Sequence, residues 1–169
     1  RLPNGNTVMS TSTTLKDAYS LGLGADHIMT HWAFDENLPK LAGPAAEGSI
    51  GLIACALVND DYPATKRVED YGKKLNPRVP MENRSVRHIQ GWVKVALAIE
   101  AMRRADKAGK LNGPGIKDGF ETMKEWTGLK ELGGQLVTIT PTDHRYSSVV
   151  RIGRVIKGKP QTVAEIDMR

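Results

Sequence analysis

The sequence has one cysteine and few aromatic residues. Cys55 is the only cysteine among 169 residues, so no disulfide can form within the chain. It lies in the apolar run IGLIACALV, where cysteine is typical of a small buried hydrophobe, and no basic partner is placed to activate a thiol. Aromatic residues make up only 5% of the chain, which leaves few side chains for stacking on bases. A disulfide scaffold is excluded, and a catalytic thiol is not indicated.

Clusters of charge and long apolar runs are also lacking. The formal net charge is +5, but the basic residues are scattered, and only the pairs Arg84/Arg87 and Arg103/Arg104 come near to a cluster. A nucleic-acid surface needs clustered basic residues, so we expect no nucleic-acid partner. No apolar run reaches the roughly 20 residues that a membrane-spanning helix needs. An apolar fraction of 40% and a length of 169 residues fit one domain or two small lobes.

Motifs for catalysis and for cofactor binding are absent. The chain contains no GxSxG, GxxxxGK[ST], HExxH or GxGxxG motif. The histidines lack metal-ligand spacing; they are His27, His31, His88 and His144. We therefore expect no catalytic residues, no metal site and no cofactor.

Apolar periodicity predicts an α/β protein with a β-rich C-terminal tail. Short apolar or β-branched runs predict strands over residues 25–30, 49–57, 135–140 and 147–158. Three- and four-residue spacing predicts helices over residues 13–22, 35–42, 64–75, 84–106 and 116–128. The first two strands are apolar on both faces, which favours a sheet covered by helices on each side.

The helix over residues 84–106 has the strongest pattern. Its predicted inner face is formed by Ile89, Trp92, Val93, Ala96, Ile99 and Met102. Val86, Val95 and Leu97 widen that face. The pattern predicts a well-buried helix.

Residues 29–48, MTHWAFDENLPKLAGPAAEG, form the candidate site. Thr30, His31 and Trp32 follow a predicted strand and precede a short helix that Asp35 can cap, and ligands bind at such places in α/β proteins. One interpretation makes His31 and Trp32 part of the core. The other makes them ligand contacts, since indole offers an apolar wall and imidazole a hydrogen bond. In contrast, Asp143-His144-Arg145 is typical of a turn stabilised by an ion pair.

Four segments in order resemble one family. They are DENLPKLAGPAAEGSIGL, DDYPATKRVEDYGKKL, IQGWVKVALAIEAMRRA and GGQLVTITPTDHRYSSVVRIGRV. Together they closely resemble the solute-binding proteins of branched-chain-amino-acid-type ABC transporters, the type I periplasmic binding proteins. The segment LAGPAAEG is the most specific match.

The resemblance implies Rossmann-like lobes with helices on both faces of a mostly parallel sheet, joined by a hinge. It matches only the C-terminal half of the family. Residues 1–57 would belong to the second lobe, 58–128 to the helical part of the first, and 129–169 to strands that return to the second lobe and hinge. The chain begins at Arg1 without a secretion signal, and we expect it to be a fragment. The missing N-terminal half, or another copy, would then cover helix 84–106.

The implied function is capture of a small molecule for an ABC uptake transporter, without enzyme activity. Its partner would be the transporter permease, and its localisation periplasmic or extracellular. The alternative is a ligand-sensing domain of a regulator or receptor with the same fold. Contacts are expected from Thr30, His31 and Trp32 first, and then from Asn4, Asn6 and Thr7.

The position of His31 tends to hold an acidic residue in the family's amino-acid binders, where it pairs with the ligand ammonium. Imidazole cannot replace a carboxylate in that role. This departure favours a carboxylated, aromatic or otherwise non-zwitterionic solute.

Overall fold

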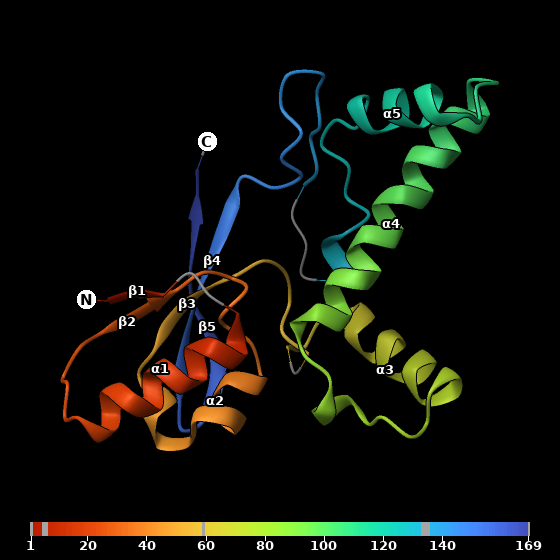
Figure 1. Ribbon diagram of the computed structural model, residues 1–169. Helices are drawn as coiled ribbons and strands as arrows, with labels where there is room; N and C mark the ends of the chain where they lie inside the picture. Colours follow the sequence, from red (N-terminus) through yellow and green to blue (C-terminus); the bar gives the residue numbers. More distant parts are fainter. Residues whose placement is uncertain (1, 5–6, 59, 133–135, 169) are drawn as a thin grey trace.

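A computed structural model describes residues 2–4, 7–58, 60–132 and 136–168 of the chain. It has two parts (Figure 1): a sheet with two helices on it, and a group of three further helices beside the sheet. The chain crosses between the parts after the third strand and returns before the fourth. Within the described residues, no helix is long and apolar enough to cross a membrane.

The sheet has five strands in sequence order. They are β1 (Leu2–Asn4), β2 (His27–Met29), β3 (Ile50–Ile53), β4 (Val149–Ile156) and β5 (Lys159–Asp167). β1, β2 and β3 are parallel, β4 is antiparallel to β3, and β5 is antiparallel to β4. The predicted α/β class is confirmed, and the two C-terminal strands extend the parallel sheet as a hairpin.

Two helices form the crossovers between the parallel strands. α1 (Val8–Ser20) joins β1 to β2, and α2 (Asn37–Ala42) with a 3-10 turn (Gly43–Ala46) joins β2 to β3. The Asp35 carboxylate accepts a hydrogen bond from the Asn37 N–H at 2.8 Å, so the predicted cap is confirmed. α2 ends at Gly43, whose φ of 59° favours glycine.

Phe34 joins the α2 side of the sheet to β3 and β4. Its side chain is 1% exposed. A Cβ built on Gly51 would lie 2.4 Å from the Phe34 ring, and one on Gly153 would lie 2.5 Å from it. The two glycines pair with each other across β3 and β4. Their missing side chains therefore make the space that the phenyl ring fills.

The second part consists of three helices and a long irregular segment. The helices are α3 (Pro63–Leu75), α4 (Val86–Lys107) and α5 (Gly113–Glu121), with short 3-10 turns at Met81–Asn83 and Lys130–Leu132. The Ser85 hydroxyl accepts a bond from the Arg87 N–H at the start of α4. The pattern predicts one helix over residues 116–128, but α5 ends at Glu121 and the chain after it consists of turns, a bend and irregular backbone.

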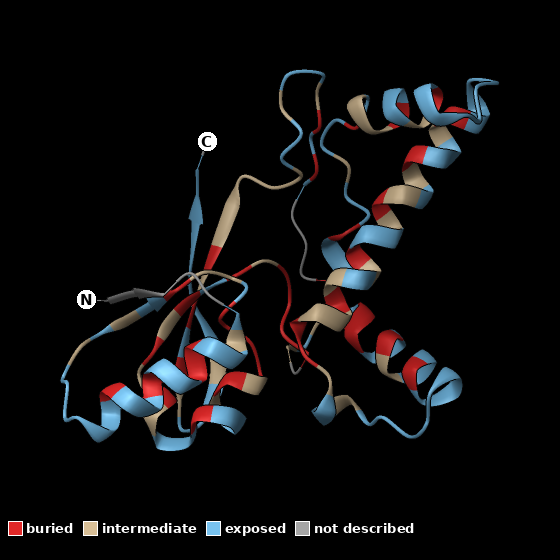
Figure 2. Ribbon diagram, in the orientation of Figure 1, coloured by how far each residue is buried: buried red, intermediate tan, exposed pale blue. Residues whose placement is uncertain are grey.

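The predicted inner face of α4 is only half buried. Ile89 and Val93 are buried, whereas Val95, Ile99 and Met102 are 57%, 42% and 45% exposed. Figure 2 shows exposed turns of α4 facing away from the sheet along its length. The periodicity identified the apolar residues correctly, but none of the described strands covers that side of the helix.

The strand predicted over residues 135–140 is wrong for the residues that the structure describes, since 136–140 do not join the sheet. Within the described residues, Val137 makes an isolated bridge with Trp126, and Thr140 makes one with Asp143. Val137 and Ile139 are buried among the residues of the second part, so their β-branched pattern reflects burial and not a strand ladder. The predicted turn after them is confirmed, since Arg145 pairs with Asp143 at 2.7 Å.

Candidate ligand-binding site

The candidate site lies where the parallel strands end. β1, β2 and β3 run in the same direction, so their carboxyl ends meet at one edge of the sheet, and this edge faces the start of α4 (Figure 1). The loop after β2 carries Thr30, His31 and Trp32 at this edge. In open α/β sheets, ligands bind outside the carboxyl ends of the strands.

Trp32 is not a core residue. Its side chain is 54% exposed, which contradicts the interpretation that places it in the core. The Arg87 guanidinium carbon lies 4.8 Å from the centre of the indole ring, and the His31 ring centre lies 4.8 Å from it with the planes inclined by 41°. A cation and an imidazole thus both contact an indole that still reaches solvent.

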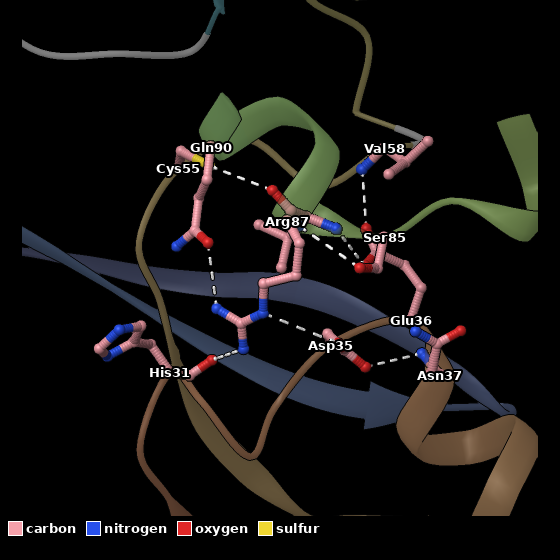
Figure 3. A network of polar contacts seen from close by, with 10 residues as sticks. His31, Asp35, Glu36, Asn37, Cys55, Val58, Ser85, Arg87 and Gln90 are labelled. Atoms are coloured by element: carbon pink, nitrogen blue, oxygen red, sulfur yellow. Dashed lines mark hydrogen bonds and ion pairs between the residues drawn. The ribbon is translucent and has the colours of Figure 1, made fainter. Parts of the chain in front are cut away.

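Arg87 holds the loop from the other part of the chain (Figure 3). It lies in the first turn of α4, and its Nη2 donates to the backbone oxygen of His31, 56 residues earlier. Nη1 donates to Gln90 Oε1 at 3.1 Å, and Nε lies 4.0 Å from Asp35 Oδ2. The guanidinium therefore connects α4 to both ends of the loop before α2.

Glu36 makes the second connection. Its side chain is 6% exposed. One carboxylate oxygen accepts from the Val58 N–H at 2.8 Å, and the other accepts from the Val86 N–H at 2.7 Å. One carboxylate thereby joins the start of α2 to the segment that follows β3 and to the first residue of α4. Burial raises the pKa of Glu36, and the two backbone N–H groups oppose that rise by favouring the ionised form.

His31 is expected to stay neutral at pH 7. Burial lowers its pKa below 6.5, and the nearby Arg87 charge lowers it further. Arg87→Gln should move the pKa of His31 upward, but not fully to 6.5, because burial remains as the larger cause. Because the folded pKa is below the unfolded one, protonation of His31 lowers stability as pH falls through 6.5.

Ring-proton NMR titration measures this pKa directly. His88 is the internal control, since burial and Arg84 lower its pKa in the same way. Arg84→Gln should raise the pKa of His88 and leave that of His31 unchanged, the reverse of Arg87→Gln. A titration of His31 at or above 6.5 in the unchanged chain would contradict the prediction.

The other predicted contact residues are placed unequally. The Thr30 hydroxyl is buried and has no hydrogen-bond partner among the described residues. Thr7 is exposed and precedes α1, where its backbone oxygen accepts from the Thr11 N–H. Asn4 ends β1 opposite Met29 and so shares the edge with Thr30. Asn6 lies outside the residues that the structure describes.

No sequence motif indicated the roles of Arg87, Gln90 and Glu36. The sequence pattern indicates Arg87 only as part of a weak basic pair and does not single out Glu36. Glu36 lies 50 residues before its partner Val86, and Arg87 lies 56 residues after its partner His31. Local spacing contains no information about such contacts.

Among the cavities lined by residues that the structure describes, two have walls from both parts of the chain. One of about 680 Å³ is lined by Glu36, Lys40, Asp60 and residues 158–162, among others. A smaller one of about 310 Å³ lies beside the turn of Asp143 and Arg145. Neither is lined by Thr30, His31 or Trp32. At the candidate site itself, the Trp32 indole is exposed.

Cys55 does not add chemistry to this edge. Its side chain is 3% exposed, and burial raises its pKa to about 12. The prediction of a small buried hydrophobe is confirmed. Within the part of the chain that the structure describes, no group of three His, Cys, Asp or Glu residues could hold a metal ion.

Solved structures match the chain along nearly its whole length. A branched-chain amino acid ABC transporter protein from Thermus thermophilus with bound valine is 25% identical, with a TM-score of 0.83 over 96% of this chain and 45% of its own. The chain has the type I periplasmic binding protein fold. A substrate-binding protein from Aeropyrum pernix is 20% identical, with a TM-score of 0.79 over 99% of this chain and 44% of its own.

A third structure with the type I fold is a fatty acid substrate-binding protein from Thermomonospora curvata. It is 17% identical, with a TM-score of 0.77 over 98% of this chain and 42% of its own. No protein-family model and no curated protein sequence matches the chain. The chain thus spans less than half the length of these three structures, and the resemblance to this group of transport proteins is confirmed.

Proposed function

We propose that the chain is part of a solute-binding protein of an ABC uptake transporter. The observation that carries the proposal is the candidate site itself: an exposed indole at the carboxyl edge of a parallel sheet, held by an arginine from the other part of the chain. Its fold neighbours are substrate-binding proteins, which supports the same role. They do not favour the alternative of a regulatory sensor.

The proposed mechanism is closure of two lobes around the solute. A solute that touches both lobes stabilises the closed form by its higher affinity for that form. The Arg87 and Glu36 contacts join the sheet part to the start of α4, so a movement of one part relative to the other would change these contacts. We propose no catalytic step, because solute capture requires none. The permease partner and a periplasmic or extracellular localisation belong to this proposal.

The exposed side of α4 supports a further component of the same protein. Val95, Ile99 and Met102 form an apolar row on α4, and Tyr71 and Leu75 of α3 are 51% and 77% exposed. Neighbouring exposed apolar side chains are typical of surfaces that a partner covers. We propose that the rest of the family's first lobe covers this row, in keeping with the 45% of the Thermus protein that the chain spans.

The test uses the full-length protein that contains this chain. A thermal-shift screen against amino acids, carboxylic acids, sugars and amines should identify at least one stabilising solute. Small-angle scattering with that solute should show a smaller radius of gyration, and amide exchange should be slow along the Val95–Met102 row. If no solute of any class stabilises the protein, a solute-binding function is wrong.

A further inference from the structure

The charged groups of the candidate site differ in whether they reach solvent, and this decides which ligand charge the site favours. Asp35 and Glu36 are 3% and 6% exposed, so neither carboxylate faces a ligand. The Asp35 carboxylate accepts from the Asn37 N–H, and both Glu36 oxygens accept from backbone N–H groups. The Arg87 side chain, in contrast, is 27% exposed. Among Asp35, Glu36 and Arg87, the charged group that reaches solvent is therefore the positive guanidinium of Arg87.

The Arg87 guanidinium retains donors for an anion. Arginine has five N–H groups. One on Nη1 is used by Gln90 and one on Nη2 by the His31 oxygen, while Nε faces Asp35 at 4.0 Å. One N–H therefore remains on each terminal nitrogen. A carboxylate accepts such donors through two oxygens, whereas an ammonium group finds no acceptor on the guanidinium and is repelled by its charge.

The Trp32 indole sets the shape of the ligand. It is flat, more than half exposed, and in contact with Arg87 and His31. A rigid, solvent-exposed indole gains most from a flat apolar group that stacks on it, because both surfaces leave water. The neutral His31 ring adds a hydrogen-bonding group without adding charge.

We propose that the solute is an organic carboxylate with a flat aromatic group, its carboxylate at Arg87 and its ring at Trp32. This rests on the proposed solute-binding function and narrows its ligand class. A zwitterionic amino acid is disfavoured, because its ammonium group would lie beside a guanidinium with both nearby carboxylates buried.

The probes separate charge from ring shape. Calorimetric titrations of the full-length protein would use benzoate, phenylacetate and 3-phenylpropanoate as aromatic carboxylates. Benzylamine retains the ring with the opposite charge, L-phenylalanine adds an ammonium group, and L-valine is an aliphatic zwitterion. At least one aromatic carboxylate should bind ten-fold or more tightly than each of these three compounds, and should quench tryptophan fluorescence.

Two variants connect the affinity to the proposed contacts. Trp32→Leu should weaken the best carboxylate about ten-fold, an effect in the range of one stacked aromatic pair, with little change in thermal stability. Arg87→Lys keeps the charge but loses the planar fork, and should also weaken it. Tyr19→Leu is the matched control, since Tyr19 is 64% exposed on α1 and lies outside the site. The affinity of this variant for the carboxylate should be unchanged.

The outcomes distinguish this inference from the proposed function. If L-valine or L-phenylalanine binds more tightly than every carboxylate, solute binding is retained and the ligand class is wrong. If none of the probes binds, the aromatic carboxylate class is also wrong, while the broader thermal-shift screen still decides the function. Unchanged carboxylate affinity in both Trp32→Leu and Arg87→Lys would place the ligand elsewhere.

Discussion

Glu36→Ala is expected to lower the free energy of unfolding by about 2–5 kcal/mol. The variant leaves the Val58 and Val86 N–H groups buried without an acceptor, and it removes a side chain that is 6% exposed. Because these two N–H groups belong to the segment after β3 and to α4, the loss of the carboxylate should also loosen the contact between the two parts. Urea unfolding monitored by circular dichroism measures the change.

Glu47→Ala is the matched control for Glu36→Ala. The Glu47 carboxylate also accepts from two backbone N–H groups, those of Lys157 and Gly158 at the turn between β4 and β5. All three residues are exposed, so water can replace the lost acceptor, and the loss should be much smaller. Equal losses in the two variants would show that burial is not the source of the Glu36 effect.

The pH dependence gives a second readout of Glu36. Its pKa in the folded chain is raised above 4.5, so the folded state binds the proton more strongly than the unfolded state. Stability from this group therefore falls as pH rises from 4.5 through the folded pKa. Glu36→Gln does not titrate, so the difference in stability between the unchanged chain and this variant should vary with pH in that window.

Features that depend on neighbouring residues could be predicted from the sequence. The Asp35 cap, the end of α2 at Gly43 and the start of α3, predicted at residue 64 and observed at Pro63, each involve residues within a few positions of one another. Capping and turn chemistry act over that range, so a pattern in the sequence is enough. The loop of Thr30, His31 and Trp32 was found in the same way, from its place between a strand and a helix.

Features that depend on distant residues could not be predicted. β5 was missed because most of its residues are exposed, and a strand without a buried face has no alternating pattern. The apolar row of Val95, Ile99 and Met102 on α4 was recognised from its periodicity. Periodicity does not indicate which element covers such a row. The roles of Glu36 and Arg87 arise only when the fold brings β2, β3 and α4 to one edge.

Phe34→Ala is the second substitution with a large expected effect, a loss of about 3–5 kcal/mol of unfolding free energy. The ring is 1% exposed and fills the space above two glycines on adjacent strands, so its removal leaves a cavity that rigid strand backbone cannot close. Gly51→Ala tests the same contact from the other side. Its new Cβ would lie 2.4 Å from Phe34, and crowding should cost about 1–3 kcal/mol.

The two changes should compensate when combined, because the alanine at position 51 then partly fills the cavity left by Phe34. A double-mutant cycle from urea unfolding should show a loss smaller than the sum of the single losses by about 0.5–3 kcal/mol. Gly91→Ala is the control, since Gly91 lies within α4 with nothing within 4 Å of the new Cβ. It should stabilise the chain by about 0.5–1 kcal/mol, because alanine favours the helix. Strict additivity of Phe34→Ala and Gly51→Ala would mean that the ring does not pack on β3, and the connection from the candidate loop to the sheet would need another explanation.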